Sequence, residues 1–86
     1  MTPHEKAHAG LRMLKEAILE TLRDHHDSMT NSEIAEDLEI PSDILGEQRN
    51  VLSWAVLGAM LKDGEVERLG RKYMIPGSGA GGQPTI

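Results

Sequence analysis

The run His4-Glu5-Lys6-Ala7-His8 has the spacing H-E-x-x-H, in which two histidines one helical turn apart bind zinc and the glutamate acts as general base. A catalytic zinc site also needs a third protein ligand and a walled cleft. Thr2, Pro3 and Glu5 together have a simpler role, because they form a capping box with proline at the first helical position. We therefore expect a solvated helix start here. Adventitious metal binding is the alternative interpretation, and a zinc hydrolase is the least favoured one.

A second group of metal-ligand types, His25-His26-Asp27, stands where this first helix should end. Adjacent histidines on a helix point about 100° apart, and cationic side chains are usual at a helix carboxyl end. We expect a helix end. The sequence shows no nucleophile–base pair and no phosphate-cradling loop, so it predicts no enzyme, no bound metal and no cofactor.

Side chains of the types that read DNA bases stand together in the middle of the chain, at Gln48, Arg49, Asn50 and Ser53. Arginine hydrogen-bonds guanine, and asparagine or glutamine hydrogen-bonds adenine. Arg49, Asn50 and Ser53 would share one narrow polar stripe of a helix, since residues three and four apart are neighbours. The alternatives are a merely solvated helix face and, for Asn50, a helix cap if the helix begins later.

Three cations follow in a predicted hairpin, Arg68, Arg71 and Lys72. They can bind phosphate or enter the minor groove of DNA, whereas the alternative is a hairpin edge that carries charge to avoid aggregation. Arg68 can also lie on the ring of Tyr73 opposite it.

The helix that should position the base-reading residues runs from about Gly46 to a left-handed cap at Gly64. Its apolar residues form two adjoining rows, which predicts that most of the helix is buried. Trp54 lies between the rows, so we expect it in the core and expect Trp54→Ala to cost about 3–5 kcal/mol. The rows consist of Leu52, Val56, Ala59 and Met60, and of Trp54, Leu57 and Leu61.

The cations should be positioned by two strands, Glu65–Leu69 and Lys72–Ile75, joined by Gly70-Arg71 in a type II′ turn. This register pairs Val66 with Ile75 and Arg68 with Tyr73. It directs Val66, Tyr73 and Ile75 to the face that lies on the helix.

Upstream, a long first helix should bury Leu11, Leu14, Ile18 and Leu22. Met29 can form a short strand. A second capping box, Thr30 to Glu33, starts a short acidic helix that ends at or before Ile40, because the residue preceding Pro41 disfavours helical geometry. Residues 41–47 then form a long connection.

Length and composition indicate one small domain, residues 1–76, with a flexible glycine-rich tail at residues 77–86. The chain has no cysteine, no apolar run near the roughly 18 residues of a membrane span and no signal-peptide pattern, so we expect a cytoplasmic protein with no membrane contact.

The net charge of −5 is unevenly spread: residues 1–47 hold four Lys/Arg against eleven Asp/Glu, and residues 48–86 hold five against three. The second half can therefore carry a small basic surface.

The run Asn50-x-x-x-Trp54-Ala55, followed by Leu61, Gly64, Val66 and Gly70-Arg71-x-Tyr73-x-Ile75, resembles the N-terminal winged-helix domain of Mrr-type restriction endonucleases. It resembles HARE-HTH domains more loosely. The resemblance covers about residues 11–76 and implies a mainly α (α+β) winged helix-turn-helix, with three helices and a C-terminal two-stranded wing. It also implies DNA binding or DNA-target sensing, as in a transcriptional regulator or an accessory module of a restriction-modification-like system. Cleavage is not implied, because the nuclease domain has no counterpart here.

We thus expect double-stranded DNA as the partner, with Gln48, Arg49, Asn50 and Ser53 in the major groove and Arg68, Arg71 and Lys72 on the backbone or in the minor groove. Binding should be weak for a monomer, with a salt slope of roughly −3 to −4.5 for three to five phosphate contacts. The alternative function is protein association or homodimerisation through the wing and the acidic second helix, part of an acidic belt from Asp27 to Glu47. The belt can also be a solubilising face.

Overall fold

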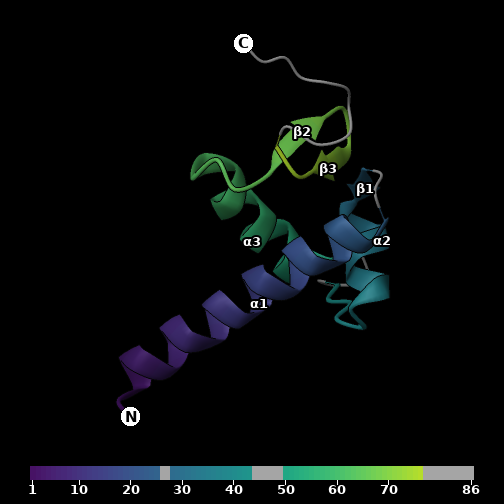
Figure 1. Cartoon of the computed structure of the whole chain (residues 1–86). Coiled ribbons are helices and arrows are strands. Elements are labelled where there is room, and N and C mark those ends of the chain that lie inside the picture. Colours follow the sequence, from purple (N-terminus) through teal and green to yellow (C-terminus); the bar gives the residue numbers. More distant parts are fainter. Residues whose placement is uncertain (26–27, 44–49, 77–86) are drawn as a thin grey trace.

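The chain forms three helices and a small antiparallel sheet (Figure 1). The computed structural model describes residues 1–25, 28–43 and 50–76. The elements are α1 (Pro3–His25), β1 (Met29–Thr30), α2 (Asn31–Asp37), α3 (Val51–Lys62), β2 (Glu67–Leu69) and β3 (Lys72–Met74). The predicted mainly helical α+β layout with a carboxyl-terminal hairpin is confirmed. The predictions for His26, Asp27, Gln48, Arg49 and the tail at residues 77–86 fall outside the described residues.

Helix α1 starts as predicted and buries only its second half. The Thr2 N–H donates to the Glu5 carboxylate at 2.9 Å, and the Glu5 N–H donates to the Thr2 hydroxyl at 3.1 Å. Ile18 and Leu22 are buried, but Leu11 is 42% exposed. The predicted buried stripe is wrong at Leu11, because the amino-terminal half of α1 extends beyond the other helices and strands (Figure 1).

Helix α2 is short and is defined at both ends by local signals. Its capping box is confirmed, with Thr30 and Glu33 each accepting a hydrogen bond from the backbone N–H of the other. The helix ends at Asp37, and Glu39 then adopts a left-handed φ of 58°. The predicted end before Pro41 is therefore confirmed.

Helix α3 is shorter and less buried than predicted. It begins at Val51, and Asn50 occupies the N-cap position. Its end is confirmed: Gly64 has φ 78° and donates to the Leu61 carbonyl at 3.1 Å. Only one side of α3 is buried. Its main contacts are with α1 and α2, and in the described part of the chain its opposite side is exposed.

Strands β2 and β3 form the predicted hairpin, and Arg68 pairs with Tyr73 as expected. Both strands are shorter than predicted, so Val66 and Ile75 lie outside the paired residues. Gly70 has φ 65°, whereas Arg71 does not have a positive φ, as a type II′ turn requires. Strand β1 pairs with the other edge of β3, so the sheet order is β1-β3-β2.

One hydrophobic core joins the helices to the sheet. Tyr73 of β3 and Val66 before β2 contribute to it, so the hairpin is attached to the helices through buried side chains. None of the helices in the described part of the chain has the length and apolar character to cross a membrane. The core consists of Ile18, Leu22, Met29, Ile34, Val56, Leu57, Met60, Val66 and Tyr73.

Candidate functional site

An open groove, which we call the Trp54 groove, lies where the start of α2, helix α3 and the hairpin meet. Trp54 is 60% exposed in it, so the predicted core position of this residue is wrong. Arg68 and Arg71 come from the hairpin to the same groove. The groove thus combines a large aromatic surface with two positive charges. Its lining residues are Thr30, Asn31, Ser32, Trp54, Arg68, Arg71 and Tyr73.

Arg68 is held in a defined position within this groove. Its guanidinium carbon lies 5.9 Å from the centroid of the Tyr73 ring, as the cross-strand pairing predicts, and its Nε donates to the Gly70 carbonyl at 2.8 Å. Arginine has five N–H donors, so this bond leaves others for a ligand. The buried Tyr73 ring therefore anchors the exposed Arg68.

Asn50 is predicted to read adenine, but in the structure it is buried and its side chain hydrogen-bonds within the protein. It is only 8% exposed and adopts a left-handed conformation, φ 50° and ψ 61°, which asparagine tolerates better than most residues. Its Oδ1 accepts from the Ser42 N–H and its Nδ2 donates to the Ser32 hydroxyl, both at 3.3 Å. Its carbonyl accepts from Nδ2 of Asn31 at 3.2 Å. Asn50 therefore connects the loop before α3 to the start of α2.

The sequence also predicts Ser53 on a solvated stripe, and this prediction is wrong. The residue is fully buried, and its hydroxyl lies 2.5 Å from Oδ1 of Asn31 and 3.1 Å from the Asn50 carbonyl. Positions 53, 56, 57 and 60 follow the spacing i, i+3, i+4, i+7 of one helix face. That spacing was a signal for burial, which the polar character of serine obscured.

The exposed side of α3 is mainly apolar. Apart from Lys62 at its end and the indole N–H of Trp54, the exposed side chains between Val51 and Lys62 offer no hydrogen-bonding group. In this part of the chain, α3 therefore has few groups for reading base edges. The exposed apolar residues are Leu52, Trp54, Ala55, Gly58 and Ala59.

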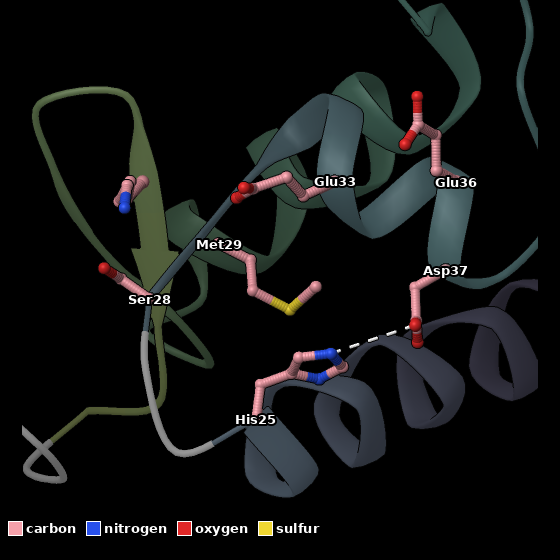
Figure 2. A pocket seen from close by; sticks show the side chains of 7 residues that line it. His25, Ser28, Met29, Glu33, Glu36 and Asp37 are labelled. Atoms are coloured by element: carbon pink, nitrogen blue, oxygen red, sulfur yellow. Dashed lines mark ion pairs between the residues drawn. The ribbon is translucent and has the colours of Figure 1, made fainter.

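Lys72, the third predicted cation, lines a separate acidic groove between α1, α2 and the sheet. Figure 2 shows side chains of this groove from the end of α1, β1 and α2, with an ion pair between His25 and Asp37. The His25 Nε2 and Asp37 Oδ1 atoms are 3.8 Å apart, and the His25 Nδ1 lies 2.8 Å from the Thr21 carbonyl. The acidic groove is lined by His25, Ser28, Met29, Glu33, Glu36, Asp37 and Lys72.

Glu33 in the acidic groove has a pKa below its usual value. The chief cause is the backbone N–H of Thr30, which donates to the carboxylate, and the Thr30 hydroxyl adds to it. The positive charges of Lys72 and His25 lower the pKa by smaller amounts. Desolvation opposes all these effects and is second in size only to the backbone hydrogen bond from Thr30. Glu33 is thus a carboxylate that serves the helix cap.

The H-E-x-x-H run is solvated, as expected. His4 and His8 are exposed on α1, their ring centroids are 4.2 Å apart, and Glu5 accepts the capping hydrogen bond from Thr2. Within residues 1–25, 28–43 and 50–76, no three or more His, Cys, Asp or Glu side chains are grouped in a way that could hold a metal ion.

We compared the chain with family models, curated proteins and solved structures, and none of the three comparisons yields a match. A functional proposal for this domain must therefore rest on the residues and geometry described above.

Proposed function

We propose that this domain binds double-stranded DNA through the Trp54 groove. The observation that carries the proposal is the exposure of Trp54 on α3 beside Arg68 and Arg71 of the hairpin. Cationic side chains bind phosphate oxygens, and an exposed indole ring can pack on the sugar or base edge next to them. Such binding would suit a transcriptional regulator or a DNA-sensing accessory module, the two roles expected from the resemblance to Mrr-type domains.

The chemistry of α3 supports binding with little sequence preference. Its described exposed surface is mainly apolar, and Asn50 and Ser53 use their polar groups inside the protein. Apolar side chains can contact the thymine methyl group but do not distinguish the hydrogen-bonding pattern of other bases. Asn50 and Ser53 are therefore not available to read bases. A contribution from Gln48 and Arg49 stays a prediction, since both fall outside the described residues.

The number of cations in the groove sets the expected salt dependence. Two arginines that each neutralise one phosphate give a slope of roughly −1.8 in log K against log salt. Affinity should then fall about twelvefold between roughly 50 and 200 mM salt. This dependence is weaker than the sequence predicts, because Lys72 lines the acidic groove rather than the Trp54 groove.

The test is an amide-shift titration of isotope-labelled protein with a mixed-sequence duplex at these two salt concentrations. Shifts should cluster at the Trp54 groove, and Arg68→Gln with Arg71→Gln should abolish most of the binding. The matched control is Arg12→Gln with Arg23→Gln, which removes the same charge from exposed positions of α1. If both double variants lose the same amount of DNA affinity, binding depends on net charge alone, and the Trp54 groove is not the site. No shifts at low salt would overturn DNA binding itself.

A second candidate function is association with a basic protein partner. The observation that favours it is the acidic groove, where Glu33, Glu36 and Asp37 lie together on α2. Among the described residues, this groove shares no lining residue with the Trp54 groove. Glu36→Lys reverses one charge at an exposed position. A lysine-rich peptide should shift amides of α2 in the wild type and bind less tightly to the variant. A peptide that leaves α2 unshifted would count against this function.

A further inference from the structure

The first turns of α1 carry an exposed histidine pair that neither groove includes. The rings of His4 and His8 lie with centroids 4.2 Å apart and a 36° angle between their planes. The helix that carries them is held by the capping box of Thr2 and Glu5. This part of α1 extends clear of the rest of the domain, so an ion in water can reach it (Figure 1).

We propose that His4 and His8 chelate a late first-row divalent metal ion, of the class Ni²⁺, Cu²⁺ or Zn²⁺. Residues four apart lie one above the other on a helix, so both imidazoles can direct a nitrogen to the same point. Imidazole is a preferred ligand of these ions, whereas Mg²⁺ and Ca²⁺ prefer oxygen.

The site has two protein ligands, which distinguishes it from a zinc hydrolase. The Glu5 carboxylate accepts the Thr2 N–H at 2.9 Å and so serves the helix cap. The described part of the chain contains no group of three or more potential ligand residues. The remaining coordination positions are therefore left to water, and the expected activity is binding only.

Metal binding should also stabilise the helix locally. Gly10 lowers the helix stability of this segment by about 1 kcal/mol relative to alanine, and a chelate between His4 and His8 requires the helical conformation of the turn between them. Amide hydrogens of residues 4–10 should therefore exchange more slowly with bound metal. Hydrogen exchange measures this effect independently of affinity.

The test is calorimetric titration of the full chain with NiCl₂ and ZnCl₂ at neutral pH, followed by exchange measurements. Binding should be one ion per chain, with ring resonances of His4 and His8 perturbed, and MgCl₂ should give no signal. His8→Gln should weaken binding at least roughly tenfold, because the second imidazole of a chelate binds intramolecularly. His25→Gln is the control for histidine content and should bind as the wild type does.

A sharper control keeps the composition constant. Lys6→His combined with His8→Lys puts the two histidines two positions apart, about 200° around the helix, so they no longer share a face. Circular dichroism checks that each variant is folded. The proposal is overturned if this double variant binds as tightly as the wild type, if His25 rather than His4 and His8 is perturbed, or if Mg²⁺ competes with Ni²⁺.

Discussion

Asn50 has two structural roles that substitution by alanine and by glycine can separate. Its side chain makes hydrogen bonds with Ser42 and Ser32, and its backbone is left-handed with φ 50° and ψ 61°. Alanine removes the side-chain hydrogen bonds and also resists the left-handed conformation. Glycine removes the same hydrogen bonds but adopts that conformation freely. The two variants therefore differ mainly in backbone strain.

The structure sets the magnitude of each loss. Two hydrogen bonds at a site that is 8% exposed contribute about 1 kcal/mol each. The left-handed conformation adds about 1–2 kcal/mol for alanine. We expect a loss of unfolding free energy of about 3–4 kcal/mol for Asn50→Ala and about 2 kcal/mol for Asn50→Gly. Either is a large fraction of the stability of a small domain.

The assay is urea unfolding followed by far-UV circular dichroism, with Trp54 fluorescence as a second probe. Ser32→Ala is the control, because it removes only the partner of the Asn50 Nδ2 and should cost about 1 kcal/mol or less. Equal stability of the alanine and glycine variants would refute the argument from backbone conformation. Near-wild-type stability of both would mean that Asn50 does not connect α2 to α3 and is available for a ligand.

Two further predictions concern exposed residues. Trp54→Ala should cost only about 1.5–2.5 kcal/mol, because the residue is 60% exposed and the remaining two-fifths of its surface, roughly 60–100 Å² of apolar area, stabilises by about 25 cal/mol per Å². If urea unfolding shows a loss of more than about 3 kcal/mol in unfolding free energy, Trp54 is a core residue and this prediction is wrong. The pKa of Glu33 is lowered in the folded state. The ionised carboxylate therefore contributes to the free energy of unfolding above the unfolded pKa, near 4.5, and this contribution is lost as pH falls through the folded pKa. The stability difference between wild type and Glu33→Ala should therefore be seen at neutral pH and shrink in acid, and a difference that stays constant down to pH ~2 would contradict this assignment.

Predictions that depend on neighbouring residues in the chain agree with the structure. The two capping boxes, the Gly64 cap and the Gly70 turn each involve residues within about six positions of one another. Their geometry follows from backbone conformation and short-range hydrogen bonds, which the sequence pattern determines. The hairpin register, and with it the Arg68–Tyr73 contact, follows from the turn length.

The candidate site, in contrast, depends on which side of α3 the rest of the domain covers. Apolar residues stand on most sides of this helix and Ser53 on its buried side is polar, so the pattern of apolar residues alone predicts the wrong environments for Trp54, Asn50 and Ser53. Packing of α1 and α2 against one side buries Ser53 and leaves Trp54 exposed. Tertiary contacts likewise put Arg68 and Arg71 in the Trp54 groove and Lys72 in the acidic groove. The sequence by itself thus determined the order of the elements and those ends that arise from local interactions, such as the two capping boxes and the Gly64 cap. Only the tertiary structure decided which side chains share a surface, because that choice depends on contacts between residues far apart in the chain.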